Sequence, residues 1–442
     1  MNNDENSPSN SAMVQQFRQS LVTKIAMLII RLGRNALLAR VLGPADRGLF
    51  SLISSLPELI MVAGNAGLSN AVSYHAAKKT RAFKILLGNA NALTLLLSCI
   101  LFVLSFWVVQ QAWLNNDNTE SLIQFQWFIA CAIPFLLIKI VYQNLLNVQQ
   151  KISQINLMSI LESLQPLVLF LFLWLVMDMN ALTAAVWSWF ISLLCLSLCA
   201  VFFLKSGFPV ALNANMQKDL LDFGFRGYLD TLFQKLLLRI DFIFVSAFIG
   251  NEALGYYSMA TAAAEILLTI PNALIVPLFS FLLRTAADDK NTVTPIVLRL
   301  LMTVMLISAA LFALLGKVLI YILFGEAFLP AYEPLLILLP GIVFLSYASL
   351  IRLDLLGHDK PGAISVISGV SVGLNIALNL LLIPHFGISG VAAASSIAYL
   401  FGAIGLYILH SRISGLTAKE TLILRRSDLA LVANYVKRKR TT

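Results

Sequence analysis

The sequence predicts an all-α polytopic membrane protein, with about twelve transmembrane helices in two parallel-repeat six-helix bundles around a central cavity. The first reason is composition: 59% of residues are hydrophobic and 12% are charged, and the mean hydropathy is +0.84. The second is the recurrence of apolar stretches of about 20 residues, the length that spans a bilayer. The third is that the two halves of the chain resemble each other.

The apolar stretches define the elements in order. The expected spans are 21–42, 48–74, 85–110, 125–146, 157–176, 181–204, 229–249, 255–283, 293–315, 335–356, 363–383 and 391–410. The expected domains are a cytoplasmic N-terminal segment (1–19), an N-terminal bundle (20–204), a cytoplasmic linker (205–222), a C-terminal bundle (223–411) and a basic cytoplasmic tail (412–442).

Basic residues in alternate loops predict the orientation. These residues are Lys78, Lys79, Arg81, Lys84, Lys151, Lys205, Lys218, Arg284, Lys290 and Lys360. The loops between them, such as 111–120 and 325–333, are acidic or neutral. Because positive loops stay inside, we expect the basic loops and both termini to be cytoplasmic. Much of the net charge of +9 lies in these loops and in the tail, which ends in Lys437-Arg438-Lys439-Arg440.

The halves align at an offset of about 208 residues. The segment 42–51, LGPADRGLFS, matches 249–258, IGNEALGYYS, in both glycines, an aromatic residue and the serine. The same alignment places Arg31 on Arg239 and Glu58 on Glu265, and 151–186 on 360–395. Since each repeat has an even number of spans, both enter the membrane in the same direction, which makes the repeat parallel.

Cations within these apolar spans are the candidate substrate-binding residues. Lys24, Arg31 and Arg34 lie on one face of the first helix, and Lys235 and Arg239 share a face of the seventh. A guanidinium at bilayer depth is costly unless it faces a partner or a wet cavity. Cations in a cavity replace the hydration of an anionic group, so these residues suit phosphate oxygens.

Carboxylates in the spans are the candidate ion-coupling residues: Glu58, Glu265, Asp230 and Asp241. For Glu58 and Glu265 the alternative is a structural pair with an arginine of the first or seventh helix. Asp230 and Asp241 lie nearly opposite Lys235 and Arg239 on the seventh helix, so we expect them to pair with neighbouring helices.

Metal, redox and catalytic signals are weak in this sequence. The four cysteines lie inside apolar spans without metal-ligand spacing, and the four histidines fall at span ends or in loops. We therefore expect no catalytic residue, no metal and no cofactor, and a protein that is not an enzyme.

Two motifs carry a resemblance to a known family. Leu-Gly-Pro-Ala-Asp-Arg-Gly-Leu-Phe at 42–50 and Leu-Ile-Pro-His-Phe-Gly-Ile-Ser-Gly-Val-Ala-Ala-Ala at 382–394 resemble the polysaccharide exporters of the multidrug/oligosaccharidyl-lipid/polysaccharide superfamily. The resemblance covers residues 17 to about 412. It implies a flippase of the bacterial inner membrane that moves undecaprenyl-pyrophosphate-linked oligosaccharide to the outer leaflet by alternating access, for O-antigen or other surface polysaccharide.

The implied partners are that lipid-linked oligosaccharide, the lipid bilayer, a coupling H+ or Na+, and other membrane proteins of polysaccharide assembly, but no nucleic acid.

One alternative is a cation-coupled drug exporter of the same superfamily. The four cations and absent carboxylates of the first span, 21–42, favour an anionic substrate over a cationic drug. The other alternative, a membrane polysaccharide polymerase or ligase, is disfavoured by external loops of only about 10 to 17 residues without paired carboxylates.

Overall fold

The computed structural model describes residues 10–78, 83–110, 119–206, 208–271, 287–358, 360–425 and 428. Within these ranges, the side chains of 10–26, 119–121, 226–227 and 287–293 are not described. The predicted basic residues Lys79, Arg81, Arg284 and those of the tail at 437–440 lie outside the described residues, and so does most of the acidic loop 111–120.

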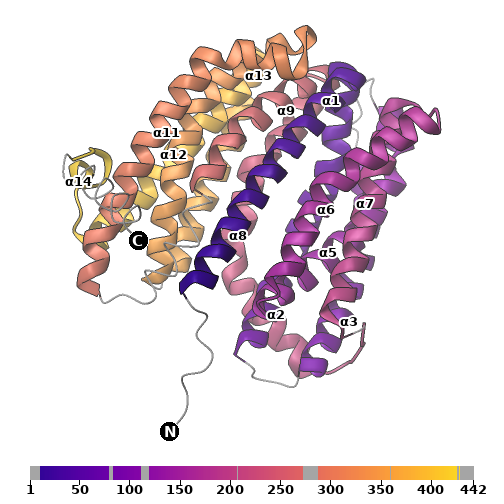
Figure 1. The fold of residues 1–442 in the computed structure, drawn as a ribbon, viewed down its shortest axis with the longest axis horizontal. Helices are drawn as coiled ribbons and strands as arrows, with labels where there is room; N and C mark the ends of the chain where they lie inside the picture. Colours follow the sequence, from indigo (N-terminus) through magenta and orange to yellow (C-terminus); the bar gives the residue numbers. More distant parts are fainter. Residues whose placement is uncertain are drawn as a thin grey trace. The chain divides into compact units, whose positions relative to one another are not determined.

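The chain divides into two compact units, Met1–Tyr228 and Leu229–Thr442. The helices of the first are α1 (Asn10–Gly64), α2 (Leu68–Ala77), α3 (Phe83–Val109), α4 (Thr119–Gln124), α5 (Gln126–Val148), α6 (Ile152–Leu171) with a π-helical end (Phe172–Val176), and α7 (Ala181–Leu204). In this unit α5 is central and packs against α1, α2, α3 and α7, while α6 packs against α1 and α7 (Figure 1).

The second unit begins inside α8 (Ala214–Phe248). It continues through α9 (Asn251–Glu265), a 3-10 turn (Ile266–Leu268), α11 (Ala287–Phe324), a 3-10 segment (Glu326–Ala331), α12 (Tyr332–Gly357), α13 (Pro361–Ser414) and α14 (Ala418–Leu422). Here α12 is central and contacts α9, α11 and α13.

Nine helices in the described part of the chain are long and apolar enough to cross a membrane. Two of them, α1 and α13, each contain a non-helical glycine that joins two helices end to end, at Gly43 and Gly387. The 35-residue α8 is also long enough to span, although it carries several charges. Together these helices account for the twelve expected spans, and the all-α membrane fold is confirmed.

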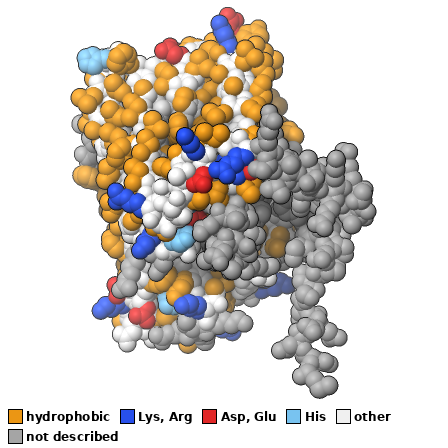
Figure 2. All heavy atoms as spheres, turned by 90° about the vertical axis from the view of Figure 1, so that its left-hand side faces the viewer, with side chains coloured by type: hydrophobic (Ala, Val, Ile, Leu, Met, Phe, Trp, Pro, Cys, Tyr) orange, Lys and Arg blue, Asp and Glu red, His pale blue; other side chains and the backbone are white. Residues whose placement is uncertain are grey.

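The outer surface agrees with a membrane environment. Figure 2 shows hydrophobic side chains over much of the described part of one face, with charged groups mainly in its middle and lower parts. On α11, Leu306, Ile307, Leu311 and Leu314 are all exposed. An apolar exterior of this extent suits lipid tails and not water.

Backbone kinks recur at equivalent places of the two repeats. Gly43 (φ 72°) and Gly250 (φ 118°), which the sequence alignment matches, both have positive φ. Asp178 (φ 51°) and Gly387 (φ 53°), which lie in the second pair of matching segments, do so as well. Positive φ is a conformation that mainly glycine adopts without strain. The two repeats therefore share an uncommon backbone conformation at these matching positions.

The break after α1 differs from the expected continuous helix over 48–74. Helix α1 ends at Gly64, and Ala66 (φ 50°) and Gly67 (φ 72°) interrupt it before α2. A Cβ atom on Gly67 would lie 2.2 Å from the carbonyl oxygen of Gly224, within α8. The backbone needs glycine here because two chain segments touch.

The segment expected to be a linker, 205–222, packs against the first unit. Asn91 Nδ2 donates to the Pro209 carbonyl at 2.7 Å, and the Asn213 backbone N–H donates to Asn89 Oδ1 at 2.7 Å. Met216 of α8 joins the hydrophobic core formed by α2, α3, α5 and α7. The division between the units therefore comes after this segment.

Candidate functional site

A cluster of charged side chains lies in the first unit where α1, α5 and α6 meet. Lys139 Nζ of α5 forms an ion pair with Glu162 Oε1 of α6 at 2.7 Å. Arg31 Nε of α1 donates a hydrogen bond of 3.1 Å to Ser163 Oγ, one residue further along α6. Arg34, one turn after Arg31, is within electrostatic range of both Arg31 and Glu162.

The cluster lies at membrane depth. At 1.5 Å per residue, Arg31 is about 18 Å along the axis from the kink in α1, Lys139 about 14 Å from the end of α5, and Glu162 about 15 Å from the start of α6. A hydrocarbon core is about 30 Å thick, so all three residues lie near its middle. Charges at this depth mark a polar path through the membrane.

A further arginine lies close to this cluster. Arg47, in the second part of α1, is 7% exposed, and the charge of Arg34 acts on it. Its Nη1 donates to Ser51 Oγ at 2.9 Å and its guanidinium lies 5.4 Å from the ring centre of Phe50. These neutral contacts leave its positive charge in the electrostatic field of the cluster.

The other predicted residues of the first unit are Lys24 and Glu58. The side chain of Lys24 is outside the described residues. Glu58 is partly buried in the second part of α1.

In the second unit, Arg239 of α8 forms a two-point ion pair with Glu265 at the end of α9. The Nη1–Oε1 and Nη2–Oε2 distances are 2.5 and 3.0 Å, and both side chains are 27% exposed. This is the structural pairing that the sequence left open for Glu265. Lys235, one turn earlier on α8, is exposed.

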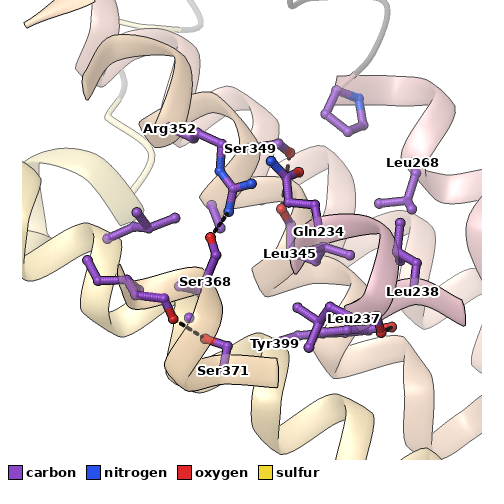
Figure 3. A pocket seen from close by; sticks show the side chains of 16 residues that line it. Gln234, Leu237, Leu238, Leu268, Leu345, Ser349, Arg352, Ser368, Ser371 and Tyr399 are labelled. Atoms are coloured by element: carbon purple, nitrogen blue, oxygen red, sulfur yellow. Dashed lines mark hydrogen bonds between the residues drawn. The ribbon is translucent and has the colours of Figure 1, made fainter. Parts of the chain in front are cut away.

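Asp230 contacts two other helices of this unit. Its Oδ1 accepts a hydrogen bond of 2.6 Å from Ser368 Oγ of α13 and lies 3.4 Å from Arg352 Nη1 of α12. Arg352 lines a cavity of about 170 Å³ between α8, α12 and α13, together with Gln234, Ser371 and Tyr399 (Figure 3). The remaining lining is mostly apolar.

Asp241 is the most enclosed carboxylate among the predicted site residues that the structure describes, with 1% of its surface exposed. It accepts hydrogen bonds from Tyr257 Oη at 2.7 Å, from Asn379 Nδ2 at 2.8 Å and from Ser395 Oγ. Asn375 connects the last two, because it donates to Ser395 and accepts from Asn379. These partners are neutral donors from α9 and α13. A carboxylate so placed is stable when it binds a proton or a cation.

The sequence interpretation overlooked three of these residues. Lys139 and Arg352 are single cations within apolar spans, and the criterion that identified Arg31 would have found both. Arg47 was read only as part of a turn motif. Ser163 and Ser368 could not have been found, because a serine in a membrane helix is common and only the fold brings a cation to it.

Comparison with known proteins identifies the family. Residues 37–333 match the family model described as polysaccharide biosynthesis protein. The chain belongs to this family. The match confirms the resemblance inferred from the glycine-containing motifs. A search of curated protein sequences found no match.

Solved structures with the same fold belong to the MOP superfamily. A multidrug resistance MATE transporter in an inward-facing conformation aligns with a TM-score of 0.73 at 13% identity, over 89% of this chain and 98% of its own. The lipid II flippase MurJ in an inward closed conformation also has a TM-score of 0.73, at 15% identity over 90% of this chain and 88% of its own. A MOP superfamily transporter from Pyrococcus furiosus aligns with a TM-score of 0.64 at 14% identity, over 93% and 99% of the two chains. This family member therefore has the fold of MOP superfamily transporters.

Proposed function

We propose that this protein is a flippase that moves undecaprenyl-pyrophosphate-linked oligosaccharide from the cytoplasmic to the outer leaflet by alternating access. The observation that carries the proposal is the cluster of Arg31, Arg34 and Lys139 at membrane depth. A pyrophosphate diester has about two negative charges that lose hydration as they cross, and fixed cations replace that hydration. Membership in a polysaccharide biosynthesis family supports a lipid-linked glycan as the cargo.

The roles of the remaining candidate residues follow from the same chemistry. Arg31 and Arg34, with Lys24, hold the phosphates on the first repeat, and Lys235 with Arg239 does so on the second. The hydrocarbon tail stays in lipid while the glycan crosses along a wet path. Release of Arg239 from Glu265 makes it available to the substrate.

The transport cycle is coupled to H+ or Na+ through Asp241. Its carboxylate, enclosed by neutral donors of α9 and α13, needs a proton or cation when water is excluded. Glu265 and Asp230, which pair with Arg239 and Arg352, and Glu58 are secondary candidates for this role.

The protein works in the bacterial inner membrane, with both termini in the cytoplasm. Its product supplies O-antigen or another surface polysaccharide, so other membrane proteins of polysaccharide assembly are its expected partners. The basic loops predict this orientation.

A cation-coupled drug exporter is the second candidate, since a MATE transporter has the same fold. The two functions separate in one assay with purified protein in liposomes. A polyprenyl pyrophosphate with a short glycan and a lipophilic cationic dye are offered in parallel, under proton and sodium gradients of either sign. Movement of the pyrophosphate lipid supports the flippase, and movement of the dye alone supports the exporter.

A further inference from the structure

The carboxylate of Glu162 is placed among cations that the proposed function assigns to the substrate. It contacts Lys139 directly at 2.7 Å and acts electrostatically on Arg34. The residue after it, Ser163, accepts the hydrogen bond from Arg31. One turn of α6 thus faces cations from both α1 and α5.

The Glu162 carboxylate is also open to replacement. Its side chain is 37% exposed, whereas that of Lys139 is 16% exposed and Ser163 is fully buried. Because the Glu162 carboxylate is partly exposed, an anion of higher charge can reach Lys139 and compete with it. Ser163, in contrast, is fixed by donating its own hydrogen bond to the Ser159 carbonyl at 3.0 Å.

The charge balance points the same way. Arg31, Arg34 and Lys139 carry three positive charges and Glu162 carries one negative charge, so the charges of these four side chains sum to +2. A pyrophosphate diester brings about two negative charges, twice that of the carboxylate it would displace. At low dielectric the cations therefore attract the phosphates more strongly than they attract Glu162. Because Glu162 has to be displaced first, the net gain on binding is smaller than it would be for cations without a partner.

We propose that the Glu162 carboxylate takes the place of the substrate's phosphates when the site is empty. In that state it interacts with Lys139 and Arg34, and it competes with the pyrophosphate group for these two cations. This inference rests on the proposed flippase function and adds the residue that sets affinity. Competition by Glu162 weakens binding and speeds release, because the cations regain a partner as the substrate leaves. Glu162 is thus a positioning and affinity-setting residue for the two cations.

The test compares binding and transport in Glu162→Gln, Lys139→Gln and wild type, as full-length protein. The probe is a short-chain prenyl diphosphate, titrated in detergent by calorimetry, followed by leaflet movement of the glycan-carrying lipid in liposomes. Glu333→Gln is the matched control, because the exposed Glu333 at the start of α12 accepts a hydrogen bond from Ser389 and is not part of the cluster.

Glu162→Gln should bind the diphosphate about fivefold tighter, which corresponds to about 1 kcal/mol. Its KM for transport should fall while its maximal rate also falls, since release becomes slower. Lys139→Gln should bind the diphosphate more weakly than wild type. Glu333→Gln should bind it as wild type does. A purely structural role of the ion pair would not tighten binding.

Equal or weaker binding by Glu162→Gln would overturn the inference while leaving the flippase intact. If Glu162→Gln does not accumulate, Lys139→Gln decides the question. Diphosphate binding by Lys139→Gln that is as tight as that of wild type would overturn the inference. Failure of wild type to bind or move any prenyl diphosphate would instead remove the proposed function, and this inference with it.

Discussion

At the residue scale, the position of Arg31 explains why an arginine is tolerated within an apolar span. Its Nε has a neutral partner in Ser163, so the charge is oriented and remains available to an anion. The matching Arg239 of the second repeat is instead held by a carboxylate. Equivalent residues in the two repeats thus have different partners, and substitution should affect them differently.

Arg31→Ala should reduce flipping by about tenfold to a hundredfold, because a charge-assisted hydrogen bond contributes about 1.5–3 kcal/mol. Arg31→Lys should retain part of the activity, since it keeps the charge without the planar fork of donors. Initial rates in liposomes, normalised to the inserted protein, measure both. Loss of the alanine variant from the membrane would show that Arg31 is needed for folding.

Arg239→Gln should destabilise the protein by about 1–3 kcal/mol, because it leaves Glu265 partly buried without its partner. The double variant Arg239→Gln/Glu265→Gln should recover part of that loss, as both charges are then absent. Thermal unfolding in detergent gives the comparison. If Arg239→Gln unfolds like wild type but no longer transports, Arg239 acts on the substrate and the ion pair adds little stability.

At the element scale, the helix ends depend on a few backbone positions that the sequence indicates only in part. The matched glycines at 43 and 250 were visible as a repeated turn motif, and both have positive φ. Gly67 was not visible, because its need for glycine comes from contact with Gly224, far along the chain. That contact fixes α8 on the first unit at Gly224.

Gly67→Ala should destabilise the protein by about 1–3 kcal/mol, since it combines positive φ with a Cβ 2.2 Å from a backbone oxygen. Gly373→Ala is the matched control, because a Cβ there, inside α13, meets nothing within 4 Å. That change should be neutral or slightly stabilising. Equal effects of the two substitutions on thermal unfolding would exclude the proposed close contact.

The segment after α13 is attached to α11 by a buried ion pair. Arg299 Nε and Nη2 donate to the Asp428 carboxylate at 2.7 Å each, and Tyr347 Oη donates to Thr421 of α14 at 2.9 Å. The hydrogen bonds from Arg299 hold the pKa of Asp428 below its usual range. The sequence left Arg299 without a role, because its partner comes from the predicted tail.

This attachment should weaken in acid. A carboxylate whose pKa is depressed by folding contributes stability above its unfolded pKa of about 4, and loses it as the pH falls through the lower folded value. Wild type should therefore unfold at a higher temperature than Asp428→Asn at pH 7. The difference should begin to shrink below about pH 4 and should vanish once the pH is below the depressed folded pKa. A difference that persists unchanged in acid would contradict this account.

At the scale of the whole molecule, hydropathy and the repeat were enough to predict the membrane class and the twelve spans, and the glycine-containing motifs indicated the family. Both signals are carried by many residues, so uncertainty at any one position matters little. The site was less predictable. Face geometry on one helix separates Arg239 from Asp241, but it cannot show that α9 and α13 surround Asp241.

Asp241→Asn should uncouple transport from its driving ion, because the amide binds neither a proton nor a cation in the same way. We expect substrate binding to persist while the rate no longer responds to an imposed proton or sodium gradient. Glu252→Gln, on the exposed start of α9, serves as the control carboxylate. A gradient response that is unchanged in Asp241→Asn would place coupling elsewhere.

The most direct test of the central claim is the initial rate at which a short-glycan polyprenyl pyrophosphate crosses between leaflets of liposomes that contain the purified protein. Wild type and the exposed control Arg425→Ala should move the lipid at the same rate. Arg31→Ala/Arg34→Ala should be at least about a hundredfold slower at equal insertion, since two charge-assisted contacts are removed. Equal rates for the double variant and wild type would contradict the claim that these arginines carry the pyrophosphate across.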